Sequence, residues 1–169
     1  VIAAQAAQNI VPCVLELGGK SANIVFEDAD LKRAVTGAQA AIFSGAGQSC
    51  VAGSRLLVQR SVLDQFQEML VTGANHIPVG DPLDTATQIG PINNDAQYQT
   101  VNRLIAAGRA EGADILAGGA RPDGGACADG YFLRPTVLGN VRNDMSIARD
   151  EIFGPVVSVI PFEDEAEAI

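Results

Sequence analysis

The chain has 169 residues, 47% of them hydrophobic, and can therefore bury the core of one ordinary domain. Its formal net charge is -9 without any basic cluster, which argues against nucleic acid and anionic membrane surfaces as partners. Three cysteines at irregular spacing and one histidine fit neither a disulfide framework nor a metal site, and no apolar run approaches the roughly 20 residues of a membrane span. We expect a soluble protein in a reducing, cytoplasmic setting that acts on a small molecule.

Strands and helices are predicted to alternate along the chain. The Ala-rich residues 1–11 indicate the tail of a helix that ends at Pro12. Short apolar runs predict buried strands at 13–15, 22–26, 54–59, 114–117, 132–138 and 156–161. Apolar periodicity predicts helices at 31–42, 62–70 and 98–105, and Ser61 with Asp64 forms a capping-box pattern before the second of them.

This order predicts the fold class. Residues 78–91 and 118–130 are rich in proline or glycine and are predicted loops between the regular elements. Strands that alternate with helices are typical of an α/β fold, here an open, largely parallel sheet flanked by helices.

Two glycine-containing stretches resemble nucleotide-binding loops but lack a required position. Gly18-Gly-Lys-Ser21 resembles the end of a P-loop, yet that motif needs a glycine where this chain has Val14. Gly45-Ala-Gly47 begins like a dinucleotide fingerprint, but the third glycine position falls on Cys50 and the preceding element is a helix. We interpret these two glycines as residues that allow the backbone to bend near Cys50.

Cys50 is the candidate nucleophile, because the small residues of the stretch 44–53 leave room for a substrate atom beside its thiol. Cys13 lies in a predicted strand and is expected to be an ordinary buried residue, while Cys127 lies in a glycine-rich loop and is expected to be exposed. His76, the usual kind of helper for a thiol, is expected to be a solvated residue at a helix end. A Cys/His hydrolase is therefore the weaker hypothesis.

Glu16 is the candidate general base. It interrupts the apolar run 14–17, and a carboxyl buried there would lose hydration and become a stronger base. A pair with Lys20, four residues on, explains Glu16 equally well, and the sequence leaves both explanations open.

Three motifs then decide the interpretation. Glu16-Leu-Gly-Gly-Lys-Ser21, Gly47-Gln-Ser-Cys50 and Glu151-Ile-Phe-Gly-Pro155 resemble, in this order, the signature motifs of the NAD(P)-dependent aldehyde dehydrogenase superfamily. Residues 23–30 and 134–138 are also similar to that family, so the resemblance covers the chain essentially end to end. It implies a fragment in which residues 1–18 end the cofactor-binding domain and residues 19–169 form a catalytic domain that is incomplete at its C-terminus.

The resemblance also implies the roles of single residues. Cys50 matches the nucleophile that attacks the aldehyde carbon, and Glu16 matches the base that activates water to hydrolyse the thioester. NAD or NADP is the implied cofactor, and no metal is implied. The other matches are the cofactor-binding residues Leu17, Gly18, Glu151 and Phe153, and the substrate-binding residues Ser49 and Val51, for which ordinary packing is an equally good explanation.

The activity that the resemblance implies is the oxidation of an aldehyde to a carboxylic acid by a homodimer or homotetramer, with the fragment alone inactive. Two alternatives from other classes remain open. One is a catalytically silent scaffold that kept this fold, and the other is a thiol esterase that works without a cofactor.

Overall fold

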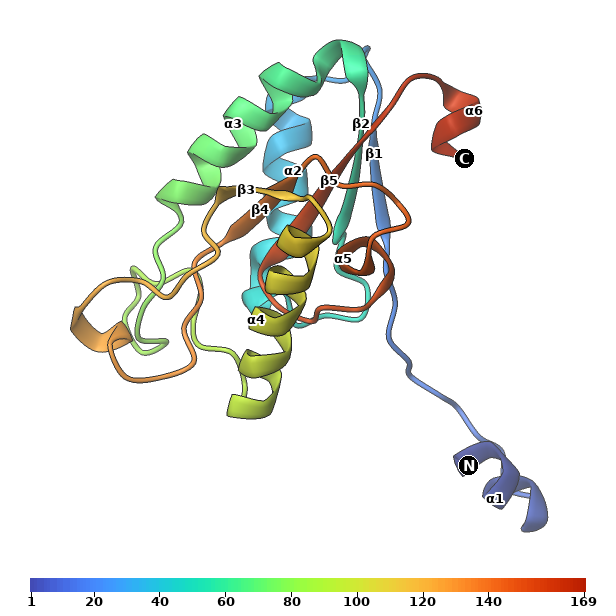
Figure 1. The fold of residues 1–169 in the computed structure, drawn as a ribbon. Helices are drawn as coiled ribbons and strands as arrows, with labels where there is room; N and C mark the ends of the chain where they lie inside the picture. Colours follow the sequence, from blue (N-terminus) through green and yellow to red (C-terminus); the bar gives the residue numbers. More distant parts are fainter.

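The computed structural model describes residues 1–169 apart from the side chain of Ala126, and its centre is one five-stranded sheet (Figure 1). Four neighbouring strands are parallel, and β3 pairs antiparallel with β4. In spatial order the strands are β1 (Ala22–Val25), β2 (Arg55–Gln59), β5 (Val156–Phe162), β4 (Thr136–Gly139) and β3 (Asp114–Ala117). The predicted open, largely parallel sheet is confirmed.

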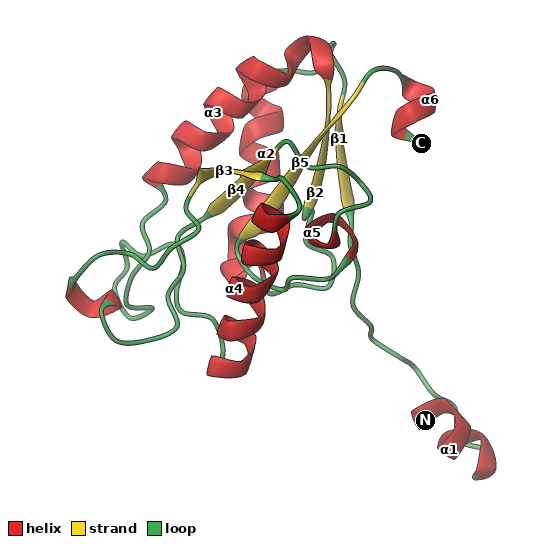
Figure 2. Cartoon of the chain, viewed as in Figure 1, coloured by secondary structure: helices red, strands yellow, loops and turns green.

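Helices cover both faces of the sheet (Figure 2). The long helices α2 and α3 pack on one face, and α4 with the single turn α5 packs on the other. The helices are α1 (Ile2–Gln8), α2 (Leu31–Phe43), α3 (Leu63–His76), α4 (Asp95–Ala110), α5 (Ser146–Arg149) and α6 (Glu165–Ala168), with short 3-10 turns at Ser44–Gly47, Arg60–Val62 and Gly125–Cys127. Within the described part of the chain, no helix has the length and apolar character needed to span a membrane.

Side chains alternate along the strands and divide the core between the two faces. In β2, Leu56 and Val58 are fully buried in the cluster formed with α2 and α3, whereas Leu57 packs against the cluster formed with α4 and α5. In β5, Val157 and Val159 repeat the pattern on the α2 and α3 side. Both faces are covered, which explains why these strands are near-continuous apolar runs in the sequence.

Residues 1–15 stand apart from this body. Figure 1 shows α1 and the segment that joins it to β1 extending away from the sheet. The strand predicted at 13–15 is wrong, because Cys13 is exposed, Val14 is 90% exposed and the segment has no regular structure. An apolar run forms a stable strand only beside a partner strand and under an apolar layer, and neither lies next to these residues in the described chain.

The predicted cap of the second long helix is also wrong. The Ser61 hydroxyl donates to the Glu27 carboxylate at 2.8 Å, and α3 begins at Leu63 without a side-chain cap. A carboxylate on the neighbouring strand end competes successfully for this hydroxyl.

Two further predictions around β4 need correction. The strand begins at Thr136 and not at 132, which agrees with Pro135 lacking the N–H that a ladder position uses. Cys127 is buried rather than exposed, and its sulfur lies 3.6 Å from the carbonyl oxygen of Val79.

Candidate active site

The three motif segments lie at one edge of the sheet. Strands β1, β2 and β5 are neighbours and all parallel, so their amino ends point to the same side. Residues 16–21, 47–50 and 151–155 come shortly before β1, β2 and β5, respectively. The pairing of these strands therefore gathers segments that are far apart in the chain.

The segments border an open hollow of about 410 Å³, which contains both predicted catalytic residues and all four predicted cofactor-binding residues. Its lining residues are Glu16, Leu17, Gly18, Cys50, Gln97, Glu151 and Phe153. Ser49 and Val51 flank Cys50 and are exposed, but they do not line this hollow. The sequence did not predict Gln97, because a glutamine on a polar helix position carries no signal of its own.

Glu151 lies directly against the backbone of the first motif. Its Oε1 accepts a hydrogen bond from the Gly19 N–H at 3.2 Å. A Cβ on Gly18 would lie only 2.0 Å from Glu151 Oε2, so a side chain at residue 18 would displace the carboxylate. The contact keeps Glu151 at the wall of the hollow.

The loop that carries Cys50 packs against the loop that follows Glu151. Gly45 and Gly47 have φ of 59° and 69°, and this confirms the predicted backbone bend before Cys50. A Cβ on Gly47 would lie 2.0 Å from the carbonyl oxygen of Gly154, so the two loops touch through their backbones. Cys50 itself is exposed to solvent at the hollow.

Phe153 holds an unusual backbone conformation beside Glu151. Its φ of 53° lies in the left-handed region, which costs a bulky residue about 1–3 kcal/mol and persists only where the surroundings hold it. The side-chain amide of Gln97 donates from Nε2 to the carbonyl oxygens of Ile152 and Phe153, at 2.7 and 3.0 Å. Helix α4 thus contacts the loop that carries Glu151.

Glu16 reaches the hollow from the exposed segment before β1. The predicted burial of its carboxylate is wrong for residues 1–169, since Glu16 is exposed. Its neighbours Leu15 and Leu17 are also exposed, at 46% and 71%. The alternative pair with Lys20 is not formed among the described residues either.

Lys20 is an unpaired cation close to the site. Its Nζ is buried and has no hydrogen-bond partner among the described residues. Loss of hydration, helped by the nearby Arg55, lowers the pKa of Lys20 to about 8, although Asp150 and Glu151 act in the opposite direction. The charged form of Lys20 is therefore less favourable in the folded chain than in water, although it still predominates at pH 7.

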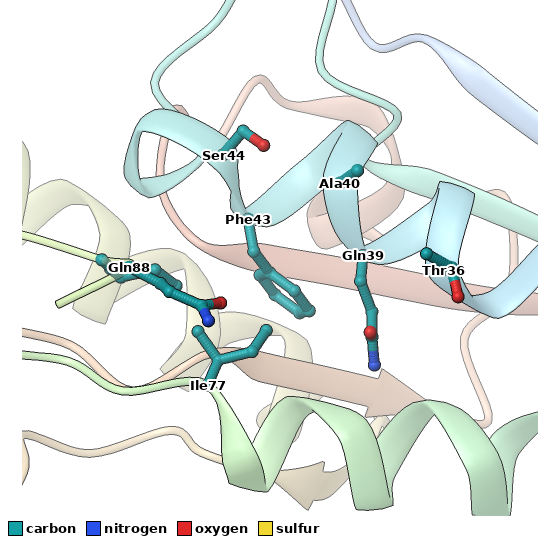
Figure 3. Close-up of a pocket in the computed structure, with 8 residues that line it drawn as sticks. Thr36, Gln39, Ala40, Phe43, Ser44, Ile77 and Gln88 are labelled. Carbon is teal, nitrogen blue, oxygen red and sulfur yellow. The ribbon is translucent and has the colours of Figure 1, made fainter. Parts of the chain in front are cut away.

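A second hollow, of about 400 Å³, lies between α2 and the segment after α3. Figure 3 shows Phe43 and Ile77 within it, with the amides of Gln39 and Gln88 at its sides. The described residues that line it carry no ionisable side chain. The hollow at Cys50, which combines a thiol with two carboxylates, is the better candidate for chemistry.

Comparison with known proteins identifies the family. The model of the aldehyde dehydrogenase family matches residues 1–169. The chain belongs to the aldehyde dehydrogenase family. The betaine aldehyde dehydrogenases of Rhizobium leguminosarum bv. trifolii and Brucella anthropi are 48% and 46% identical to it over 168 residues, which are 99% of this chain and 34% of each relative. The chain thus spans about a third of the length of these aldehyde dehydrogenases.

Solved structures of aldehyde dehydrogenases share the fold. Betaine aldehyde dehydrogenase from Staphylococcus aureus in complex with NAD+ is 42% identical with a TM-score of 0.94, over 99% of this chain and 33% of that one. A mutant aldehyde dehydrogenase from Bacillus cereus is 43% identical with a TM-score of 0.93, with the same coverage. The family predicted from the three motifs is confirmed.

The buried cation predicts a pH-dependent stability difference. The unfolded chain holds the Lys20 proton up to the ordinary pKa of 10.5 and the folded chain only up to about 8, so stability rises with pH between these values. In the complete protein, Lys20→Met should raise the free energy of unfolding by about 3 kcal/mol at pH 7, and most of this gain should be absent at pH 10. Urea denaturation followed by circular dichroism measures both values.

Lys32→Met, on the exposed surface of α2, is the matched control and should change stability little at either pH. An equal effect of Lys20→Met at pH 7 and pH 10 would contradict the assignment of a lowered pKa.

Proposed function

We propose that the complete protein is an NAD(P)-dependent aldehyde dehydrogenase that oxidises an aldehyde to a carboxylic acid. The main support is the single hollow lined by Cys50, Glu16 and Glu151, which come from three separate motifs. Membership of the family and the similarity to betaine aldehyde dehydrogenases support the same class of reaction. Because the chain spans a third of those relatives, parts of the protein outside residues 1–169 complete the site.

The residues of the hollow fit the pyridine end of NAD or NADP. Glu151 Oε1 is held by Gly19, while its Oε2 accepts no hydrogen bond among the described residues and is available to ribose hydroxyls. Because Gly18 has no Cβ, the Glu151 carboxylate can lie against its backbone, in the space that a side chain at residue 18 would fill. The backbone at Leu17 and Gly18 and the ring of Phe153 would hold the rest of this end. When bound, the cofactor supplies an oxidised pyridine ring that accepts a hydride.

Cys50 forms the covalent bond to the substrate in this proposal. Its thiolate adds to the aldehyde carbon, and the carbonyl electron pair moves onto oxygen to give a thiohemiacetal. The backbone N–H of Cys50 is a suitable donor to that oxygen. Loss of a hydride from the same carbon leaves a thioester on Cys50. The small neighbours of Cys50 suit this step, because thiol, substrate and cofactor must meet in one place.

Glu16 completes the reaction as a general base. It takes a proton from water, and the resulting hydroxide adds to the thioester carbon. The carbon–sulfur bond then breaks, which releases the carboxylic acid and returns Cys50 as a thiolate. The position of Glu16 on the wall of the same hollow as Cys50 supports this role.

We also propose the division of the chain that the motifs suggest. Residues 1–18 end a cofactor-binding domain, and residues 19–169 belong to the catalytic domain. The exposed apolar residues of the first part, including Ile10 at 91% exposure, support this division because they require a cover that the described chain does not provide. A homodimer or homotetramer in the cytoplasm is the expected setting.

Residues 1–169 alone should be inactive, since the hollow lacks the parts that lie outside this chain. Purified fragment mixed with NAD or NADP and an aldehyde panel should give no absorbance increase at 340 nm. Turnover that depends on Cys50 in this fragment would show that the hollow is already complete.

Removal of the thiol should abolish the activity of the complete protein. Cys50→Ala deletes the only atom that bonds to the substrate, so kcat for aldehyde oxidation should fall on the order of 10³-fold or more. Cys13→Ala, in the segment outside the hollow, is the matched control and should retain the rate. An unchanged rate in Cys50→Ala would refute the mechanism, and ester hydrolysis without a cofactor and without aldehyde oxidation would favour the esterase.

Removal of the base should separate the two halves of the reaction. Glu16→Gln keeps the size of the side chain but cannot take a proton from water, so the thioester should form and then persist. Rapid mixing should show one burst of reduced cofactor per site followed by a stall, and mass spectrometry should find an acyl group on the Cys50 peptide. Glu68→Gln, on the exposed face of α3, should turn over normally. Steady turnover by Glu16→Gln would assign the base to another residue.

A further inference from the structure

The start of helix α4 touches both loops that form the hollow. Gln97, in its first turn, donates from one amide nitrogen to the carbonyl oxygens of Ile152 and Phe153. On the other side, the N–H of Asn93 donates to Gln48 Oε1 at 3.0 Å, and Gln48 lies two residues before Cys50. The stretch 93–97 therefore joins the loop of the nucleophile to the loop of Glu151.

The carbonyl contacts of Gln97 match the chemistry of an amide. Its Nε2 carries two N–H groups, and two carbonyl oxygens lie within 2.7 and 3.0 Å of that nitrogen. Ile152 is buried, so water cannot readily replace the donor to its carbonyl. A glutamate at residue 97 would instead place carboxylate oxygens against both carbonyl oxygens. Both groups are hydrogen-bond acceptors, so neither hydrogen bond could form.

The segment 152–154, which Gln97 contacts, contains a backbone conformation that requires stabilising contacts. Phe153 has a φ of 53°, a conformation that a bulky residue leaves when its neighbours allow it. The next residue, Gly154, lies so close to α4 that a Cβ there would be 2.7 Å from Val101 Cγ2. Helix α4 therefore makes a polar contact with this loop through Gln97 and an apolar contact through Val101.

We propose that Gln97 is a positioning residue that sets the backbone conformation of Phe153 and, through it, the direction in which Phe153 and Glu151 face the hollow. The effect on the loop follows from the contacts of this chain alone. The effect on the cofactor rests on the proposed function, because it assumes that Glu151 and Phe153 bind NAD or NADP.

Two variants of the complete protein test this proposal. Gln97→Leu removes both donated hydrogen bonds, and Gln97→Glu retains the shape but reverses the polarity toward the two carbonyls. Gln99→Leu is the matched control, since Gln99 lies on the same helix, is exposed and, among the described residues, donates to Asp95 on that helix. Amide hydrogen exchange of residues 152–154 without cofactor gives the first readout, and the dissociation constant for NAD and NADP by calorimetry gives the second.

Exchange at 152–154 should rise about tenfold or more in both Gln97 variants while the strands β2 and β5 keep their protection, and Gln99→Leu should match the unmodified protein. Cofactor affinity should fall about tenfold, with a raised KM for the cofactor and a smaller change in the KM for the aldehyde. Unchanged exchange at 152–154, or a rise of equal size throughout the sheet, would overturn the proposal. If the unmodified protein binds neither NAD nor NADP, the proposed function fails, and the exchange data still decide the role of Gln97.

Discussion

The parallel pairing of β1, β2 and β5 is the constraint on which the candidate site depends. Each of these strands is preceded by one of the three motif segments, and parallel neighbours bring their amino ends to the same edge of the sheet. Ligands of open α/β sheets commonly bind outside the carboxyl ends of the strands, whereas here the chemistry-bearing residues gather at the amino ends. An antiparallel β2 would move Cys50 to the opposite edge and separate it from Glu16 and Glu151.

Close backbone approaches then convert this alignment into a site. Glu151 fits against Gly18 and is held by Gly19, while Gly47 touches the carbonyl of Gly154. Because these positions are glycines without side chains, the three loops can pack closely together. Helix α4 stabilises this arrangement through the hydrogen bonds of Gln97. The hollow remains open because Glu16 enters it from an exposed segment and not from the packed core.

The sequence predicted the parts of the fold whose apolar pattern reports local burial. Strands β1, β2, β3 and β5 and helices α2 and α4 follow directly from such patterns, because residues 22–169 supply their own cover. The same reasoning failed at Cys13 and Glu16, since an apolar run indicates burial but not the partner that provides it. It failed at Ser61 because the competing carboxylate of Glu27 is distant in sequence.

In the candidate site, too, the sequence predicted the residues of local motifs but not those whose role depends on distant partners. The residue types of the three motifs identified six lining residues, through their resemblance to a family and not through spacing alone. Gln97 could not be found in this way, because its importance arises from two carbonyl groups that lie 55 and 56 positions away in the chain. The unfavourable environment of Lys20 was likewise invisible, since a lysine after two glycines resembles any surface cation until its Nζ is seen to be buried without a partner among the described residues.

In the proposed function, the thiol of Cys50 and the carboxylate of Glu151 face one shared space that a dinucleotide enters. The most direct test is the rate at which iodoacetamide alkylates Cys50 in the complete protein, followed by peptide mass spectrometry with and without saturating NAD. We expect NAD to change this rate severalfold, and Glu151→Ala to reduce the change at the same NAD concentration. Binding of NAD, shown by calorimetry, with no change in the alkylation of Cys50 would contradict it.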